Sequence, residues 1–277
     1  MRILIVLFLL AFVPPAHADA ACTLEAPCSV GEGAEIGEYA MLTPEGWDGE
    51  APLRPIMFLH GHNSSMKSTI NSGSLRSSFV DQGFVLIAPQ GNARNGAGPR
   101  RWPGTPDPDW RDDRAFLLAV LDDVAARLPL AGVPVISGFS AGGSMAWMMG
   151  CYHGDRFGAV ISVAGALRRP NSPDCTMPPR ALHVHGFGDS QVPLEGRGIR
   201  DWHQGTVADT LALFRQSRGC RSNPDAITIG ADWRTRVWQS CVGGHLAYVE
   251  HDGGHGLPRG WSEIAARWLE SGALPQE

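Results

Sequence analysis

A concentration of positive charge is absent from this sequence of 277 residues. Its 23 Lys and Arg residues are outnumbered by 28 Asp and Glu residues, which gives a net charge of −5. The basic residues are spread along the chain, apart from the pairs Arg100-Arg101 and Arg168-Arg169. A protein that binds nucleic acid or an anionic membrane needs a basic patch to attract phosphate groups. The composition therefore predicts no nucleic-acid partner, and we interpret the arginine pairs as solvated loop charges.

The apolar segment at the N-terminus is too short to cross a membrane as a helix. It covers residues 3–13, follows the basic start Met1-Arg2 and precedes Ala16-His17-Ala18. A basic start, a short apolar run and an A-x-A site are the pattern of a signal peptide. We predict a signal peptide over residues 1–18, with cleavage after Ala20 as the second choice. Since Cys22 lacks the upstream leucine of a lipoprotein signal, we expect a secreted or periplasmic protein with no membrane anchor.

The C-x-x-C spacing of many zinc and redox sites does not occur in the sequence, and no metal site is predicted. An exported protein meets an oxidising compartment, where an even number of cysteines indicates disulfide bonds. Six cysteines allow fifteen pairings, of which we expect the one that joins nearest neighbours, with buried free thiols as the alternative. The candidates are Cys22, Cys28, Cys151, Cys175, Cys220 and Cys241.

Internal repeats and long low-complexity segments are absent as well, and the composition is that of an ordinary globular protein. Hydrophobic residues make up 43% of the sequence and charged residues 18%. From residue 55 onward, short aliphatic runs alternate with helical patterns, which is typical of an α/β fold. The predicted strands are 56–59, 84–88, 133–137, 159–163, 181–184 and 246–250, and the predicted helices are 112–128, one directly after Ser140, 206–216 and 260–269.

These elements predict a mostly parallel central sheet with helices on both faces, no large lid domain and a single catalytic domain over residues 19–277. The stretch from Gly91 to Trp110 is rich in Gly and Pro and follows a predicted strand. We therefore expect a long loop that shapes a binding site. Trp102 and Trp110 are candidates for lining the substrate pocket. The alternative is that they are packing residues, since tryptophan is largely buried on average.

The strongest local motif is Gly138-Phe139-Ser140-Ala141-Gly142, a G-x-S-x-G sequence. It follows the apolar residues 133–136 and precedes a predicted helix. This is the context of a nucleophile elbow, a tight strand-to-helix turn in which the serine has strained backbone geometry and the glycines leave room for it. A simple strand-to-helix turn is the alternative interpretation. We predict that Ser140 is the nucleophile of an α/β-hydrolase fold.

A serine nucleophile needs a base to take its proton and a carboxylate to orient that base. In the fold with this elbow, the acid and then the histidine follow the serine, each at the end of a later strand. Asp189 follows strand 181–184 in the sequence His-Gly-Phe-Gly-Asp, and His255 follows strand 246–250 after a Gly-Gly pair. We predict Asp189 as the acid and His255 as the base. Alternatives nearby in the sequence are Asp201, Asp252, His245 and His251.

Attack on an ester creates an oxyanion that needs hydrogen-bond donors. In this fold, one donor is the backbone N–H after the nucleophile and the other comes from the loop after an early strand. These positions are Ala141 and His62, the latter in the sequence His60-Gly61-His62; the two imidazoles are expected to support the loop. His183 and His185 suggest a pair of metal ligands, but we expect them on opposite faces of their strand, which argues against zinc.

Together these motifs resemble the α/β-hydrolases that include polyhydroxybutyrate depolymerases and feruloyl or acetylxylan esterases. The resemblance runs from about Arg54 to Leu269. It rests on Leu59-His60-Gly61, Ala88-Pro89-Gln90-Gly91, the Trp102 loop, Asp112-Asp113 with the following helix, residues 138–143, His185-Gly186 with Asp189 and Val192-Pro193, and Gly253-Gly254-His255. It implies Ser140, Asp189 and His255 as nucleophile, acid and base, and a disulfide between Cys220 and Cys241.

The expected function is hydrolysis of a carboxylic ester, such as a hydroxyalkanoate oligomer or a feruloyl or acetyl ester, through an acyl-enzyme on Ser140. No cofactor is expected, because the three side chains supply nucleophile, base and charge stabilisation. Two positions depart from the family: His62 stands where depolymerases often have Cys, and Leu257 where relatives commonly have Trp. Substrate preference is therefore left open. The alternatives are a serine peptidase related to prolyl oligopeptidases and a non-catalytic binding protein on a hydrolase scaffold.

Overall fold

The computed structural model describes residues 22–93, 98–103, 110–170, 175–199 and 202–274. The predicted signal peptide over residues 1–18 and the alternative acid Asp201 therefore lie outside the described residues.

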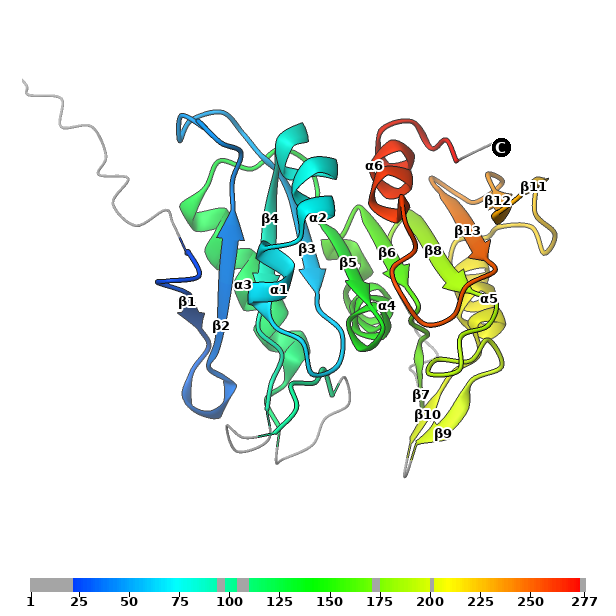
Figure 1. Ribbon diagram of the computed structural model, residues 1–277, viewed down its shortest axis with the longest axis horizontal. Helices are drawn as coiled ribbons and strands as arrows, with labels where there is room; N and C mark the ends of the chain where they lie inside the picture. Colours follow the sequence, from blue (N-terminus) through cyan, green and yellow to red (C-terminus); the bar gives the residue numbers. More distant parts are fainter. Residues whose placement is uncertain (1–21, 94–97, 104–109, 171–174, 200–201, 275–277) are drawn as a thin grey trace, which may run out of the picture.

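Strands and helices alternate through most of the described chain (Figure 1). The strands are β1 (Cys28–Val30), β2 (Gly37–Leu42), β3 (Arg54–Leu59), β4 (Phe84–Pro89), β5 (Val135–Phe139), β6 (Ala159–Val163), β7 (Arg168–Arg169), β8 (Arg180–Gly186), β9 (Arg197–Ile199), β10 (Trp202–Gln204), β11 (Ala226–Ile229), β12 (Trp233–Trp238) and β13 (His245–His251). The helices are α1 (Met66–Ile70), α2 (Gly73–Ser78), α3 (Asp113–Arg127), α4 (Ala141–His153), α5 (Val207–Ser217) and α6 (Trp261–Ser271).

The main sheet is parallel in its middle and antiparallel at its edges. Among the described residues it has ten strands, in the order β1-β2-β4-β3-β5-β6-β8-β13-β12-β11. The pairs from β4 to β13 are parallel, whereas β1 and β2 extend one edge and β12 and β11 the other as antiparallel strands. Because the middle strands are parallel, their carboxyl ends and the loops that follow lie at one end of the sheet.

Helices cover both faces of this sheet (Figure 1). Successive residues of β3 point into two separate cores: Met57 packs in the core that includes Phe214 of α5, and Phe58 in the core that includes Trp268 of α6. Helices α3 and α4 pack in the first core, and α2 packs in the second. Such burial on both faces explains the continuous apolar runs of the middle strands. The predicted α/β-hydrolase fold is confirmed.

Helices α3 and α5 begin where a side chain caps the first turn. Asp112 accepts hydrogen bonds from the backbone N–H groups of Arg114 and Ala115 at the start of α3, and Thr206 accepts one from Asp209 at the start of α5. These are the residue types that satisfy the free N–H groups of a first helical turn. The boundaries that the sequence predicted for α3 and α5 are close to the observed ones.

Three disulfide bonds join nearest neighbours along the chain. They link Cys22 to Cys28, Cys151 to Cys175, and Cys220 to Cys241. The predicted pairing is confirmed, including the pair that the family resemblance implied, and the alternative of free thiols is wrong.

Several elements were not predicted from the sequence: the antiparallel edge strands, helices α1 and α2, and a small sheet with the strand order β7-β10-β9. Edge strands lack a continuous apolar run; in β11, Ile227 and Ile229 are 61% and 76% exposed. The predicted strand 133–137 begins only at Val135, because Val133 is 57% exposed and Pro134 has no N–H to donate.

Within the described residues, no helix is both long and apolar enough to span a membrane.

Candidate active site

Ser140 occupies a strained turn between β5 and α4. Its φ of 56° and ψ of −118° are unfavourable for a residue with a side chain. The neighbouring glycines allow the turn: a Cβ at Gly138 would lie 2.4 Å from the carbonyl oxygen of Gly142, and a Cβ at Gly142 would lie 2.0 Å from that of Leu59. No larger residue fits at either position without a backbone shift. The turn places Ser140 at the carboxyl end of the parallel strands.

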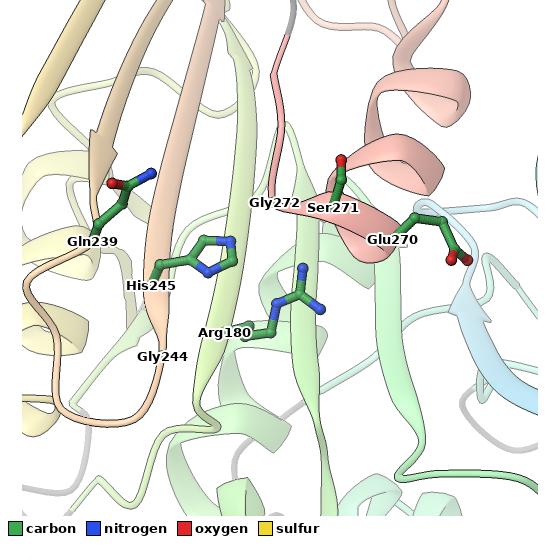
Figure 2. A pocket seen from close by; sticks show the side chains of 7 residues that line it. All are labelled: Arg180, Gln239, Gly244, His245, Glu270, Ser271 and Gly272. Carbon is green, nitrogen blue, oxygen red and sulfur yellow. The ribbon is translucent and has the colours of Figure 1, made fainter.

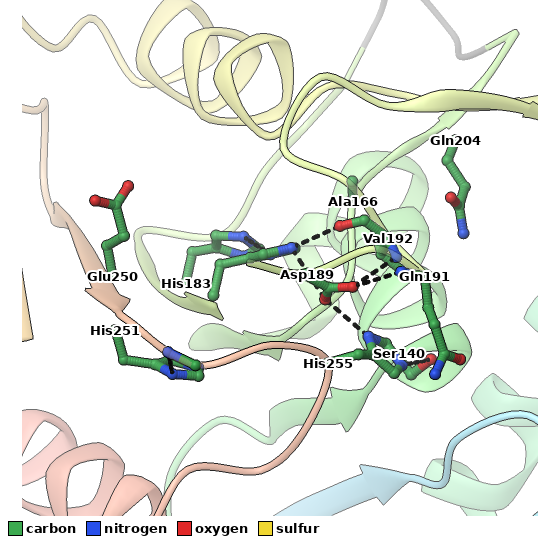
Figure 3. Close-up of polar contacts among 12 residues, drawn as sticks. Ser140, Ala166, His183, Asp189, Gln191, Val192, Gln204, Glu250, His251 and His255 are labelled. Carbon is green, nitrogen blue, oxygen red and sulfur yellow. Dashed lines mark hydrogen bonds and ion pairs between the residues drawn. The ribbon is translucent and has the colours of Figure 1, made fainter. Parts of the chain in front are cut away.

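Ser140, His255 and Asp189 form one line of hydrogen bonds (Figure 3). Ser140 Oγ lies 2.9 Å from His255 Nε2, and His255 Nδ1 lies 2.7 Å from Asp189 Oδ2. An ionised carboxylate can only accept, so Nδ1 donates to Asp189 and Nε2 of the neutral ring accepts from the serine hydroxyl. The Phe139 ring packs against His255, with ring centroids 5.1 Å apart. The structure thus brings together the three side chains singled out in the sequence.

Asp189 is enclosed by hydrogen-bond donors. Its side chain is fully buried, and Oδ1 accepts from the backbone N–H groups of Gln191 and Val192 at 2.9 and 2.8 Å. Burial acts to raise the pKa of Asp189, but hydrogen bonds from His185, Val192 and His255 outweigh burial and hold the pKa well below its usual range. The carboxylate is therefore ionised at neutral pH.

The two expected oxyanion donors lie on adjoining segments. The loop after β3 passes so close to the elbow that a Cβ at Gly142 would lie 2.6 Å from the carbonyl oxygen of His60. Ala141 is the first residue of α4, where N–H groups have no partner within the helix. His62 follows in the adjoining loop with an exposed side chain. The donor roles of Ala141 and His62 stay predictions.

His60 and Trp102 hold this loop in place. The N–H of Gly91 donates to His60 Nε2 at 3.0 Å, so Nδ1 carries the ring proton and donates to the carbonyl oxygen of Gly61 at 2.8 Å. Burial lowers the pKa of His60 to about 4, and the ring is neutral. Trp102 Nε1 donates to the His60 carbonyl oxygen at 2.8 Å.

Trp102 is therefore a packing residue, the alternative considered from the sequence. It is 1% exposed, so its indole is not open to a substrate. Trp110 is half-buried, with the guanidinium of Arg101 5.7 Å from its ring centroid, and its contact with substrate stays a prediction.

Arg168 is a buried cation beside the same loop, so its interpretation as a solvated charge is wrong. The side chain donates to the carbonyl oxygens of Trp102 and Pro103 and lies 3.4 Å from that of Ala141. The guanidinium also lies over the Trp202 ring, 5.1 Å from its centroid. Burial lowers the pKa of Arg168 to about 10, which leaves it charged at neutral pH. It joins the loop containing Trp102 to the start of α4.

The alternative acids and bases among the described residues have other partners or lie elsewhere. His251 accepts a hydrogen bond from the N–H of Gly253 at 3.1 Å, and Asp252 pairs with Arg234 at 2.9 Å. His245 is the first residue of β13 and therefore lies at the end of the sheet opposite Ser140. None of these described residues takes the place of Asp189 or His255 in the hydrogen-bonded line.

A hollow of about 400 Å³ lies at that opposite end of the sheet (Figure 2). Arg180 and His245, the first residues of β8 and β13, line it together with Glu270 at the end of α6. Arg180 donates to the carbonyl oxygens of Trp268 and Leu269 and so caps α6. The hollow is thus separate from the residues around Ser140.

His183 and His185 lie on one face of β8, so the expectation of opposite faces is wrong. Residues i and i+2 of a strand share a face, and His183 Nε2 lies 3.0 Å from His185 Nδ1. Trp147 of α4 donates its indole N–H to His183 Nδ1 at 3.2 Å. Trp147 and Arg168 were both missed as residues of this region, because their partners are far away in the sequence.

The sheet order, the helix layers and the elbow define the α/β-hydrolase class, and solved structures of that fold are similar along most of the chain. An acetyl xylan esterase from Aspergillus awamori has a TM-score of 0.64 at 11% identity, with 87% of this chain and 98% of that one covered. Esterase PE8 has a TM-score of 0.56 at 21% identity, with 83% and 96% covered. At these identities the likeness shows the fold.

Sequence comparison then gives the family. The esterase family described as "Putative esterase" matches residues 36–206, more than half of the chain, and the chain belongs to it. The matched span contains Ser140 and Asp189. Feruloyl esterase C of Emericella nidulans is 28% identical over 232 residues, which cover 80% of this chain and 78% of that protein. The protein is a carboxylic ester hydrolase.

Proposed function

We propose that the protein is a secreted serine esterase that cleaves its substrate through an acyl-enzyme on Ser140, with His255 as general base and Asp189 as the acid that orients it. The line of hydrogen bonds from Ser140 Oγ through His255 to Asp189 Oδ2 carries this proposal. The strained φ of Ser140, which is typical of a nucleophile elbow, supports it further.

In the acylation step, His255 Nε2 takes the hydroxyl proton while Ser140 Oγ attacks the carbonyl carbon of the ester. The ionised carboxylate of Asp189 stabilises the imidazolium that forms. His255 then gives the proton to the alcohol oxygen as the C–O bond breaks, and the acyl group stays on Ser140. A water molecule activated by His255 releases the acid by the same sequence of steps.

The tetrahedral oxyanion of each step would accept hydrogen bonds from the backbone N–H groups of Ala141 and His62. One such donor typically lowers the barrier by about 3 kcal/mol. The contacts of His60, Trp102 and Arg168 with the adjoining loops support this role, because they fix the loop against the elbow before substrate arrives.

The substrates that we propose are feruloyl or acetyl esters or hydroxyalkanoate oligomers. Feruloyl esterase C and an acetyl xylan esterase are among the similar proteins. Phe187 and Leu257, in the loops of Asp189 and His255, are 65% and 44% exposed and suit the apolar part of an ester. Comparison of kcat/KM for methyl ferulate, acetylated xylan and hydroxybutyrate oligomers tests this assignment; turnover of a proline peptide without ester turnover would replace it with a peptidase.

The central test is Ser140→Ala, with Ser137→Ala, in the strand β5 that leads to Ser140, as a matched control. Ser137 is 1% exposed and its hydroxyl bonds nothing among the described atoms. Ser140→Ala should abolish hydrolysis of p-nitrophenyl acetate and labelling by a fluorophosphonate, with an unchanged unfolding temperature. Ser137→Ala should retain both. Hydrolysis at the wild-type rate by Ser140→Ala would overturn the proposal.

Secretion is proposed from the signal peptide expected over residues 1–18 and is supported by the three disulfides, which persist in oxidising compartments. Expression of the full chain should give a periplasmic or extracellular protein whose mass lacks residues 1–18. A cytoplasmic product with these residues attached would contradict secretion and leave the assignment of Ser140 untouched.

A further inference from the structure

Two buried histidines that the proposed mechanism does not use lie directly behind Asp189. His183 and His185 are both 0% exposed, and their rings are 5.1 Å apart. Trp147 lies on one side of the pair and Val192 on the other. The four residues form a line of hydrogen bonds that ends at the turn holding the carboxylate. Figure 3 shows His183 and Val192 of this line beside Asp189.

The proton positions along this line follow from its two ends. The indole N–H of Trp147 can only donate, so His183 Nδ1 accepts it and the ring proton of a neutral His183 lies on Nε2. That proton is donated to His185 Nδ1 at 3.0 Å, so His185 carries its own proton on Nε2. The carbonyl oxygen of Val192 can only accept, and it lies 2.8 Å from His185 Nε2. Every bond therefore points from Trp147 toward Val192.

The last N–H of the line, on His185 Nε2, faces both the backbone and the carboxylate of the turn around Asp189. Val192 accepts from His185 through its carbonyl oxygen and donates to Asp189 Oδ1 through its N–H at 2.8 Å. His185 Nε2 also lies 3.4 Å from Asp189 Oδ2, the oxygen that accepts from His255. A single N–H thus fixes the backbone of the turn and faces the oxygen that orients His255.

We propose that His185 is a positioning residue for Asp189, and that His183 and Trp147 fix the tautomer in which His185 donates. This inference rests on the proposed function, in which Asp189 orients His255. In the opposite tautomer, His185 would present a lone pair to the Val192 carbonyl and to the carboxylate, and both would be repelled. Displacement of a reacting group by about 1 Å costs up to about 10²-fold in rate, so the line acts on kcat.

The same contacts argue against a metal site at these histidines. All the ring nitrogens of His183 and His185 are engaged in hydrogen bonds. Burial holds the pKa of His183 well below its ordinary value, so the His183 ring stays neutral at physiological pH.

Matched substitutions at His185 test the proposal. His185→Leu removes both hydrogen bonds, whereas His185→Gln keeps a donor and an acceptor. With p-nitrophenyl acetate, we expect His185→Leu to lower kcat by about 10-fold to 100-fold with KM nearly unchanged, and His185→Gln to recover a large part of that loss. His245→Leu, at the opposite end of the sheet, is the control; it should lower the unfolding temperature and leave kcat unchanged.

Trp147→Phe tests the same idea with an aromatic ring kept in the core, since it deletes the indole N–H and leaves a smaller side chain. It should lower kcat by several-fold, less than His185→Leu does. Without the indole N–H, the opposite tautomers of His183 and His185 compete with the tautomers in which His185 donates to Val192. If His185→Leu and Trp147→Phe keep wild-type kcat, or if His185→Gln loses as much kcat as His185→Leu, the positioning role is wrong. Failure of Ser140→Ala to abolish activity would instead overturn the proposed function itself.

Discussion

Gly142 is the residue of the site with the least room for change. The Cβ of an alanine there would lie 2.0 Å from the backbone carbonyl oxygen of Leu59, and no side-chain movement relieves such a contact. The loop that holds His62 must therefore shift away from the elbow. Because the loop carries a proposed oxyanion donor, this one methyl group acts on stability and on catalysis together.

We predict that Gly142→Ala destabilises the protein by about 1–3 kcal/mol and lowers kcat by about 10²-fold, the typical effect of losing one oxyanion donor. Urea unfolding and hydrolysis of p-nitrophenyl acetate measure the two effects. Gly73→Ala is the control, because a Cβ at Gly73 meets nothing within 4 Å. Equal behaviour of the two variants would show that the loop does not depend on Gly142.

The single residues that the sequence predicted and those it missed differ in the range of their contacts. Ser140, Asp189 and His255 each follow a strand within a recognisable local pattern, so their meeting at one end of the sheet could be expected. Arg168 and Trp147 act through partners distant in sequence, a carbonyl oxygen of Trp102 and a ring nitrogen of His183. No local pattern carries such information. The side-by-side histidines of β8 could have been predicted, since alternate strand residues share a face.

Helix α3 shows how one cap sets the start of an element. Asp112 accepts from the N–H groups of Arg114 and Ala115 through Oδ1, at 2.9 and 3.4 Å. Asp112→Ala should lower the free energy of unfolding by about 1 kcal/mol, and Asp112→Asn, which keeps the accepting oxygen, by less. Chemical denaturation at neutral pH measures both. Equal losses in the two variants would assign the effect to charge and not to the cap.

Among the elements, the sequence predicted the buried ones and missed the exposed ones. The middle strands are apolar on both faces and stand out as short continuous runs, which is why their positions were nearly correct. Among the residues that the structure describes, strand β11 pairs only with β12, and it leaves Ile227 and Ile229 exposed, so no burial pattern marks it. The pairing of β7 with β10 joins segments on either side of β8, and such a partner is set by the tertiary fold.

Acid stability is a property of the whole molecule in which buried histidines oppose a buried carboxyl group. His60 has a pKa lowered to about 4 by burial, so between about pH 6.5 and 4 the unfolded chain binds a proton that the folded one does not. The free energy of unfolding therefore decreases through His60 as the pH is lowered across that window. Asp113 acts in the opposite sense. Burial, only partly offset by Arg111, raises the pKa of Asp113 to about 6. As the pH is lowered, the folded state therefore binds this proton before the unfolded state does, which stabilises the fold.

We predict that His60→Gln flattens the decline of stability between about pH 6.5 and 4, since the glutamine keeps an acceptor for the N–H of Gly91 and does not titrate. The slope difference from wild type should approach about 1.4 kcal/mol per pH unit. Urea unfolding at a series of pH values gives both slopes. Parallel curves for the two proteins would mean that His60 is not the group responsible.

The arrangement of the sheet also has a practical consequence for engineering. Ser140, Asp189 and His255 follow the carboxyl ends of β5, β8 and β13, whereas the turn that leads into β11 lies at the opposite end of the sheet and includes the exposed residues Ser222 and Asn223. Exposed turns of this kind accept inserted sequence readily. A label or immobilisation tag placed there would extend the molecule on the side away from Ser140, where attachment to a support leaves the esterase open to its substrate.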